Sequence, residues 1–396
     1  MIEFDNVKIF TDNIDETALN QIKDLVKTEV FKGLPIRIMP DVHAGCGEVI
    51  GFTVPVKDKI IPNIVGVDIA CGMLTARIDT DEIDFKRLDE VIRRTVPNGQ
   101  RVHDYPNEYV RSSFIDKLKC KDALHNVGHL MCSLGTLGGG NHFIEVDKDE
   151  GGKYYLIIHT GSRNLGKQVA EYYQRKAIDH CKKTDTKPLI AELKRCGLHQ
   201  EISGLLKKVK ESNPDLPPAL CYLEGQDVID YLHDVYICTQ FALENRFQIA
   251  QNIMAGMGWR FCWRFTTLHN YIDQDATGVY IRKGAIAAYK GEPVLIPLNM
   301  RDGCILGVGK GNPDWNYSAP HGAGRVMSRM QARSELKLGD YIKSMEGIFT
   351  TSVNEFTIDE APFCYKPAAE IIDLVKETVD IQHILQPVYN FKSSEV

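Results

Sequence analysis

The sequence predicts an α+β fold in which a single domain of mixed β-sheets surrounds a central cleft and carries helices on its outside. Short apolar runs separated by Gly, Pro and Asp fill residues 36–78, and helical patterns are concentrated at 168–256. Strands do not alternate regularly with helices, which disfavours a doubly wound α/β fold. The 396 residues, 43% of them hydrophobic and 25% charged, have an ordinary globular composition. We therefore expect one domain over 1–396, with a helical insertion at about 168–256.

The elements follow from periodicity and breaker residues. Residues 81–96 and 105–118 have helical patterns, and LGTLGGGNHFIEV and YYLIIHTGSR predict strands that end in glycine loops. Residues 168–212 are helical and basic, and the Pro-rich segment ESNPDLPPALCYLEG follows them. Apolar residues recur at spacings of three and four over 226–254, which predicts one long amphipathic helix with Asn245 and Arg246 on its polar face. The segments GVYIRKGAIAAY and PVLIPLNM then predict strands.

Charge and cysteine usage limit the classes of partner and compartment. The net charge of −6 gives no global attraction for nucleic acid, so an anionic ligand would need a local cluster of cations. The eleven cysteines contain no CxxC pair, which favours reduced thiols. No apolar run approaches the ~18 residues of a membrane helix, and the N-terminus does not have the pattern of a secretory signal. We expect a soluble cytoplasmic protein without a membrane partner.

Five short segments place metal-type ligands beside glycines or at strand ends. They are PDVHAGCG (Asp41, His43, Cys46), GVDIACGM (Asp68, Cys71), GGGNHFIEV (His142, Glu145), IIHTGSRNLG (His159, Arg163) and TLHNYI (His269, Asn270). A thiolate with a carboxylate and imidazoles suits Mn²⁺ or Zn²⁺, and a sulfur can bridge two ions. Taken alone, these segments are better explained by a capping aspartate, a buried cysteine or a hydrogen-bonded histidine than by metal binding. Spacing does not show that they meet.

The segment SAPHGAGR sets His321 before a Gly-Ala-Gly turn, with Arg325 and Arg329 four and eight residues further on. If a helix begins near Gly324 or Arg325, its free N–H groups and these cations form an anion site beside the imidazole. A neutral imidazole there can attack phosphorus. A capping histidine and a further metal ligand are equally open interpretations. The glycine-rich LGTLGGGNH and GVGKGN match neither a P-loop nor a dinucleotide fingerprint.

The chain resembles the RtcB family of RNA-splicing ligases from about residue 30 to the C-terminal tail. The motifs PDVHAGCG, VGVDIACGM, LGTLGGGNHFIEV, HTGSRNLG, LHNYI, RKGAIAA and SAPHGAGRVMSR occur in the family's order and at about its distances. The resemblance implies a GTP- and Mn²⁺-dependent ligase that joins RNA 2′,3′-cyclic phosphate or 3′-phosphate ends to 5′-hydroxyl ends, in tRNA splicing or RNA repair. GMP would pass from a histidine to the RNA 3′-phosphate, giving an RNA(3′)pp(5′)G end from which the 5′-hydroxyl displaces it. An archease-type activator is an expected partner.

The resemblance also implies roles for individual residues. His321 would take GMP, and Asp41 would act in the later ligation steps. Asp68, Cys71 and His142 would hold one Mn²⁺ ion and Cys71, His159 and His269 the other, with Cys71 as the bridge. The implied nucleotide-binding residues are Asn141, His142, Phe143, Ile144, Glu145, His269, Asn270, Pro297, Asn299, Met300, Cys304, His321, Gly322, Ala323, Gly324 and Lys392, with Glu145 and Lys392 at the guanine. RNA phosphates would meet Arg163, Arg246 and Arg325, although ordinary salt bridges explain Arg163 and Arg246 equally well.

Two departures from the family pattern suggest a divergent subgroup. Many relatives have P-G-S-M-G where this chain has PLNMRDG (Pro297–Gly303), so nucleotide contacts and the preference for guanine could differ there. Cys46 stands where a basic or aromatic residue is common. A metal-dependent cyclic phosphoesterase is the alternative function, since metal-bound hydroxide alone could open a cyclic phosphate. A non-catalytic RNA-binding subunit is a third hypothesis, which the presence of a full set of expected ligands disfavours.

Overall fold

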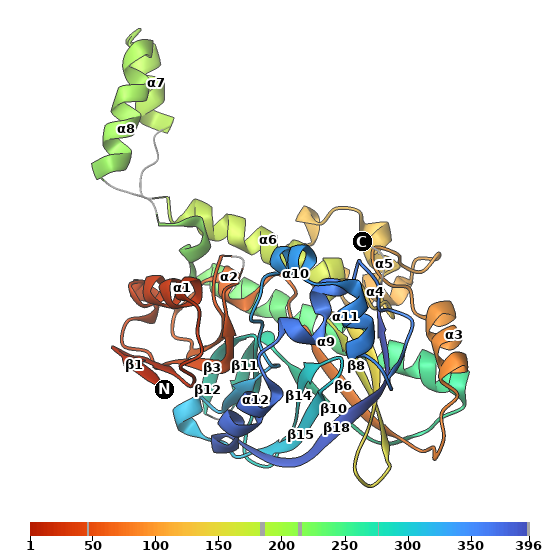
Figure 1. Cartoon of the computed structure of the whole chain (residues 1–396). Coiled ribbons are helices and arrows are strands. Elements are labelled where there is room, and N and C mark those ends of the chain that lie inside the picture. The colour runs from red at the N-terminus through yellow and green to blue at the C-terminus, as the bar shows by residue number, and fades with distance from the viewer. Residues whose placement is uncertain (46, 183–186, 213–215, 276, 394–396) are drawn as a thin grey trace.

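The structure is a computed structural model that describes residues 1–45, 47–182, 187–212, 216–275 and 277–393, so Cys46 lies outside the described part. Strands occupy the middle of the molecule and most helices surround them (Figure 1). Strands and helices do not alternate regularly along the chain, which confirms the predicted α+β fold. Among the described residues, no helix has both the length and the apolar character needed to cross a membrane.

A six-stranded sheet combines the N-terminal strands with two strands from the second half of the chain. Its order is β1-β2-β3-β4-β12-β11, antiparallel except between β2 and β3. The strands are β1 (Ile2–Phe4), β2 (Val7–Ile9), β3 (Ile36–His43), β4 (Ile50–Pro55), β12 (Gly278–Lys283) and β11 (Asn270–Asp275). The pairing of β3 with β4 shifts register between Ile38 and His43. This irregular end of β3 carries Asp41 and His43.

An eight-stranded sheet supplies most of the remaining site residues. Its order is β10-β6-β8-β7-β18-β15-β14, and β17 pairs with β18 off this path. The strands are β10 (Phe261–Leu268), β6 (Gly72–Ile78), β8 (Tyr154–Thr160), β7 (Phe143–Lys148), β18 (Val379–Lys392), β15 (Gly303–Gly309), β14 (Pro293–Asn299) and β17 (Phe349–Thr350). Two short pairs join β5 (Lys59–Ile60) to β9 (Leu223–Glu224) and β13 (Ala285–Ala287) to β16 (Ser318–Pro320).

The helices differ from the expectations mainly in their bounds. The α-helices are α1 (Glu16–Val26), α2 (Pro62–Val65), α3 (Phe85–Thr95), α4 (Glu108–Ser113), α5 (Val127–Met131), α6 (Arg163–His180), α7 (Lys187–Arg195), α8 (Ile202–Ser212), α9 (Gln226–Met257), α10 (Arg329–Glu335), α11 (Leu338–Ser344) and α12 (Ala368–Leu374). Short 3₁₀ turns are η1 (Glu29–Phe31), η2 (Ile115–Lys117), η3 (Lys121–Ala123), η4 (His199–Glu201), η5 (Pro218–Leu220), η6 (Pro313–Trp315), η7 (Ile358–Glu360), η8 (Pro362–Cys364) and η9 (Val375–Glu377). The predicted long helix is confirmed as α9, which ends at Gly258 in the left-handed conformation that a glycine cap favours.

The helical region predicted at about 168–256 has two structural parts. Helices α6 and α9 pack against each other, and α9 also contacts β8, so both belong to the body of the protein. Only the α7–α8 hairpin projects from it (Figure 1).

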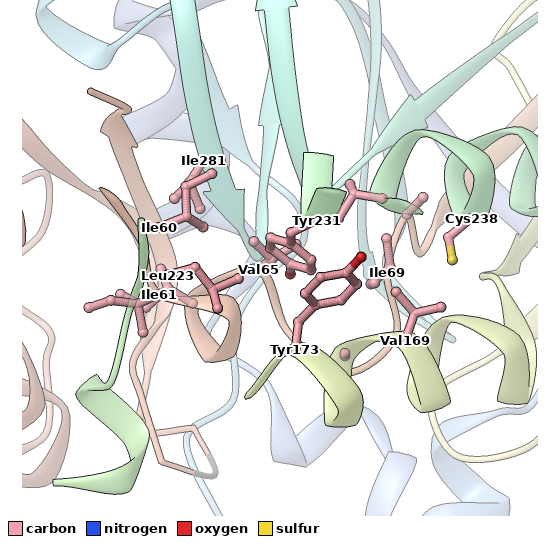
Figure 2. Packing of buried hydrophobic residues seen from close by; sticks show 14 of the residues in the cluster. Ile60, Ile61, Val65, Ile69, Val169, Tyr173, Leu223, Tyr231, Cys238 and Ile281 are labelled. Atoms are coloured by element: carbon pink, nitrogen blue, oxygen red, sulfur yellow. The ribbon is translucent and has the colours of Figure 1, made fainter. Parts of the chain in front are cut away.

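The largest hydrophobic cluster anchors the loop that carries Asp68 and Cys71. Ile69, between these two residues, is fully buried and packs among Val65, Val169, Tyr173 and Tyr231 (Figure 2). The rings of Tyr173 on α6 and Tyr231 on α9 lie 4.9 Å apart between centroids. Because burying such side chains excludes alternative loop positions, the packing fixes the loop against α6 and α9.

Candidate active site

The loop between α2 and β6 is shaped so that two potential metal ligands point to one place. Ala70 has a φ of 57°, a left-handed conformation that is uncommon outside glycine. Ser162 donates a hydrogen bond from its hydroxyl to the Ile69 carbonyl at 2.5 Å. A Cβ atom on Gly161 would come within 2.3 Å of an Asp68 carboxylate oxygen, so only glycine permits this approach. The Asp68 carboxylate and the Cys71 thiol are thereby held together.

Three histidines from distant parts of the chain surround Cys71. His142 precedes β7, His159 lies near the end of β8, and His269 joins β10 to β11. Cys71 Sγ is 3.5 Å from His142 Nε2 and 3.2 Å from His159 Nε2. His159 Nε2 is 3.1 Å from His269 Nε2, and His142 Nε2 is 3.0 Å from Asp68 Oδ2. The structure therefore brings together all five residues predicted to bind metal. We call these five residues, Asp68, Cys71, His142, His159 and His269, the metal-type cluster.

These side chains fit two adjacent metal ions. Asp68, Cys71 and His142 form one group and Cys71, His159 and His269 another, and within each group the ligand atoms lie within 4.8 Å of one another. His142 and His159 direct Nδ1 at the carbonyl oxygens of Leu137 (2.9 Å) and Asn141 (3.2 Å), which leaves Nε2 available to bind a cation. Asp68 Oδ1 and His269 Nδ1 are buried and have no hydrogen-bond partner among the residues that the structure describes. A shared thiolate between two imidazole-containing groups suits Mn²⁺ or Zn²⁺.

The electrostatic environment also suits cations. Burial lowers the pKa of His159 and His269 well below the usual value, so both imidazoles are neutral. Burial alone would raise the pKa of Asp68, but His142 and the charge of Arg163 hold it below its usual value. Burial raises the pKa of the Cys71 thiol well above its usual value, so a thiolate there requires a bound cation.

Arg246 and Asn245 on α9 support this cluster from behind. Both residues are fully buried. Arg246 donates to the carbonyls of Ala70 (3.0 Å) and Thr160 (2.6 Å), and Asn245 bonds the backbone of Thr136 and Gly161. Both residues were expected on the polar face of α9, but at these positions that face is buried, and their polar atoms bind loop backbone that would otherwise be unpaired. The contact of Arg246 with RNA phosphates stays a prediction.

Replacing Arg246 by methionine is expected to lower the free energy of unfolding of the metal-free protein by about 2–4 kcal/mol, because two buried carbonyls lose their donor. Arg87 offers a matched control, since its exposed guanidinium also bonds a backbone carbonyl, that of Gly256, at 3.0 Å. Arg87→Met should change stability by less than about 0.5 kcal/mol. Urea denaturation in the presence of a chelator measures both values, and equal losses in the two variants would contradict the buried role of Arg246.

His321 lies beside the metal-type cluster and is oriented by Asp41. Its ring centroid is 4.7 Å from that of His269. Asp41 is fully buried, and its Oδ2 lies 2.6 Å from His321 Nδ1 while accepting from the backbone N–H groups of His321 (3.1 Å) and Gly322 (3.2 Å). A Cβ atom on Gly324, which has a φ of 77°, would come within 2.2 Å of the Asp41 carbonyl oxygen. The glycines thus let the loop close onto Asp41, and the carboxylate keeps the proton on Nδ1, leaving the Nε2 lone pair available.

A cavity of about 850 Å³ opens at His321 and holds most of the predicted nucleotide-binding residues. Its lining includes Asn141, Phe143, Glu145, His159, Pro297, Asn299, Met300, His321, Gly322, Ala323, Gly324, Arg325 and Lys392. The PLNMRDG departure is therefore part of the cavity wall, through Pro297 to Met300. This volume is in the range of small-molecule sites.

Other predicted nucleotide contacts do not line the cavity. Ile144 packs in the core on the opposite face of β7, because side chains alternate along a strand. Cys304 is buried with its Sγ 3.8 Å from Glu145 Oε1. Asn270 Oδ1 accepts from the Gly284 N–H at 3.0 Å, and its Nδ2 lies 3.5 Å from the Asp68 carbonyl oxygen. Asn270 therefore connects the loop that carries Asp68 to the residue that follows β12. His142 and His269 belong to the metal-type cluster.

Arg163 and Arg325 are closer to solvent than Arg246. Arg163 Nε donates to Thr136 Oγ1 at 3.2 Å, and its guanidinium packs so closely on Gly138 that a Cβ there would meet it at 2.0 Å. Arg325 donates to the Asp359 carbonyl at 2.7 Å and lies 3.5 Å from Glu360. Within the described residues, no helix begins at Gly324 or Arg325, where the sequence analysis considered one. Helix α10 begins only at Arg329, after the Ser328 cap. Arg325 instead forms a β-bridge with Tyr365.

Among the cavity residues that were not predicted from the sequence, two contact predicted ones. Asn390 on β18 donates from Nδ2 to Glu145 Oε2, and Glu360 accepts from Lys392 Nζ at 2.8 Å. The period of two in YNFK could have revealed Asn390, because it places Asn390 and Lys392 on the same face of a strand. Glu360 carries no such signal.

Comparisons with known proteins show the family to which the chain belongs. A family model described as tRNA-splicing ligase RtcB matches residues 21–125 and 119–393. The RNA-splicing ligase RtcB of Escherichia coli K12 is 28% identical over 426 residues, covering 96% of each chain. The tRNA-splicing ligase RtcB of Aeropyrum pernix is 26% identical over 83% of this chain and 81% of its own length. The RNA-splicing ligase RtcB homolog 1 of Entamoeba dispar is 24% identical over 85% of this chain and 74% of its own. Because the family model spans most of the sequence, the protein belongs to the tRNA-splicing ligase RtcB family.

Proposed function

We propose that this RtcB-family chain is an RNA ligase that joins 2′,3′-cyclic phosphate or 3′-phosphate ends to 5′-hydroxyl ends, using GTP and two Mn²⁺ ions. The observation that carries the proposal is the position of His321, which lines the cavity and lies against the metal-type cluster with its Nδ1 held by Asp41. Hydrolysis alone would not need this oriented imidazole, so ligation through a histidine intermediate explains the arrangement better.

In the proposed reaction, His321 Nε2 attacks the α-phosphorus of GTP and forms a P–N bond while the α–β phosphoanhydride breaks and pyrophosphate leaves. A cyclic phosphate end is first opened by water to a 3′-phosphate. The RNA 3′-phosphate then attacks the phosphorus of the histidine-bound GMP, so that the P–N bond breaks, His321 is released and an RNA(3′)pp(5′)G end forms. The 5′-hydroxyl of the second RNA finally attacks the 3′-phosphorus and releases GMP. Asp41 holds the proton on Nδ1 and stabilises the positive charge that His321 gains as its P–N bond forms.

The other residues of the metal-type cluster and the cavity would bind the cations, the nucleotide and the RNA. Asp68, Cys71, His142, His159 and His269 would hold the two cations, which when bound offset phosphate charge and favour in-line displacement. Phe143, Pro297, Asn299 and Met300 would enclose the nucleotide, with Glu145 and Lys392 beside its base. Arg163 and Arg325 would meet RNA phosphates.

Asp41→Asn is expected to slow protein guanylylation by about 10²–10³-fold, because the amide keeps one acceptor oxygen but loses the negative charge. The KM for GTP should change little, since Asp41 is fully buried behind His321. Single-turnover formation of the protein–GMP adduct at several GTP concentrations measures both quantities. A raised KM with an unchanged maximal rate would assign Asp41 to nucleotide binding.

The proposal also covers the cell compartment and the source of the RNA. The ten cysteines in the described part of the chain are all free, which supports a reducing compartment such as the cytoplasm. The RNA substrate would come from tRNA splicing or RNA repair, and an archease-type protein would assist turnover.

A sealing assay tests the proposed function. RNA with a 2′,3′-cyclic phosphate and a separate RNA with a 5′-hydroxyl are incubated with the protein, Mn²⁺ and either GTP or ATP. We expect joined RNA with GTP and much less with ATP. Opening of the cyclic phosphate without joining, at a rate independent of GTP, would instead indicate a phosphoesterase.

A further inference from the structure

A third group of metal-type ligands lies apart from the two groups described above. Glu145 and Asp147 on β7 and Cys304 on β15 each offer one ligand atom, and these atoms lie within 4.8 Å of one another. Glu145 is 2% exposed, and Asp147 and Cys304 are fully buried. None of the three belongs to the Asp68, Cys71, His142, His159 and His269 cluster.

The acids of this group have few partners of their own. In the described part of the chain, neither carboxylate oxygen of Asp147 has a hydrogen-bond partner, and Asn390 Oδ1, which is also fully buried, has none either. Glu145 accepts from Asn390 Nδ2, and its Oε1 lies 3.8 Å from Cys304 Sγ. Lys392, on the same strand as Asn390, donates its Nζ to Glu360 at 2.8 Å. Several buried acceptor oxygens of this group therefore lie close together, and the structure describes no ion pair between them and a lysine or arginine.

The surroundings make bare charge costly. Cys304 belongs to an apolar cluster with Phe143, Tyr155, Ile157, Leu295 and Leu385, and Asp147 is paired with Tyr155 and Pro387 across its two neighbouring strands. Adjacent carboxylates in such a setting must take up either a proton or a cation. One shared proton would satisfy a single contact between the two acids. It would leave other buried oxygens of Asp147 and Asn390 unpaired, whereas one ion can accept several of these lone pairs.

We propose that Glu145, Asp147 and Cys304 form a third cation site, which takes Zn²⁺ and lies behind the wall of the nucleotide cavity. Thiolate and carboxylate ligands together suit Zn²⁺ better than Mg²⁺ or Ca²⁺. Glu145 lines the cavity, whereas Asp147 and Cys304 do not, so the ion braces Glu145 from the side away from the nucleotide. The site uses different ligands from the other two groups and does not depend on the proposed ligase chemistry.

Zinc stoichiometry tests the site directly. Wild type, Asp147→Asn, Cys304→Ala and the control Cys364→Ala are stripped with a chelator, reloaded with Zn²⁺ alone, freed of excess ion by gel filtration and analysed for bound zinc. Cys364 is a matched control because it is fully buried but outside all three ligand groups. We expect Asp147→Asn and Cys304→Ala to bind one equivalent of Zn²⁺ less than wild type, and Cys364→Ala to bind the wild-type amount. Unchanged zinc in both site variants would overturn the proposal and indicate a proton shared between the two acids.

Cobalt spectroscopy separates this site from the Cys71 cluster. In Cys71→Ala, Co²⁺ should still give a thiolate charge-transfer absorption, which disappears in Cys71→Ala/Cys304→Ala. If Asp147→Asn does not fold, Cys304→Ala decides alone, because it leaves both carboxylates in place. A cobalt–thiolate absorption that survives in Cys71→Ala/Cys304→Ala would contradict the assignment. The outcome does not depend on nucleotide or RNA, so failure of the ligase proposal would be visible separately.

Discussion

His321→Ala is expected to reduce RNA sealing by about 10⁴-fold or more, because the variant lacks the imidazole that would form the covalent intermediate. His321 is the histidine that lines the cavity with its Nδ1 fixed by a buried carboxylate, at 2.6 Å from Asp41 Oδ2. Single-turnover sealing of a cyclic-phosphate RNA measures the loss. Metal content should stay at the wild-type value, since His321 is outside both ligand groups of the Cys71 cluster.

The control for His321 is a histidine with a surface role. His383 on β18 is exposed and pairs with Glu150 at 3.0 Å, so His383→Ala should seal RNA at the wild-type rate. Sealing by His321→Ala within tenfold of wild type would exclude a covalent histidine intermediate.

Cys71→Ala is expected to remove both Mn²⁺ ions of the cluster, because its thiol is the ligand that the two groups share. Elemental analysis after Mn²⁺ loading and gel filtration measures the loss, and adduct formation should fall with it. Cys364→Ala provides the matched buried-cysteine control and should retain both ions.

His269→Ala gives the sharper comparison, since His269 belongs to only one of the two groups. We expect this variant to lose chiefly one ion and to keep the ion held by Asp68 and His142. Equal metal loss in Cys71→Ala and His269→Ala would contradict the bridging position of Cys71.

Much of the candidate site was visible in the sequence, but only as separate pieces. GVDIACGM and SAPHGAGR suggested ligands and an anion site, yet hydrogen-bonded histidines were the favoured interpretation of His142 and His159, and His269 alone indicated no role. They gather around Cys71 because β10, β6, β8 and β7 are neighbours in one sheet, and the residues that precede β6 and β7 lie at the same edge as the ends of β8 and β10. Strand order is not encoded in local spacing, so the family resemblance, rather than periodicity, brought these residues together.

Polar residues inside helices were the least predictable feature. The spacing over 226–254 correctly predicted α9 and placed Asn245 and Arg246 on its polar face. Because polar residues usually lie outside, the spacing did not indicate that this face is buried at these two positions. Their burial depends on the unpaired carbonyls of the loops at Ala70, Thr136 and Thr160, which come from remote segments. The late start of α10 has a similar cause, since Arg325 pairs with Tyr365 on a distant segment instead of starting a helix.

The most direct measurement is the mass of the protein after incubation with GTP and Mn²⁺ in the absence of RNA, followed by peptide mapping. We expect a single added GMP on the peptide that contains His321. The adduct should be stable to alkali and labile to acid, as expected for a P–N bond, and it should be absent from His321→Ala. The absence of any adduct in protein that has bound both Mn²⁺ ions, or an adduct on another residue, would contradict it.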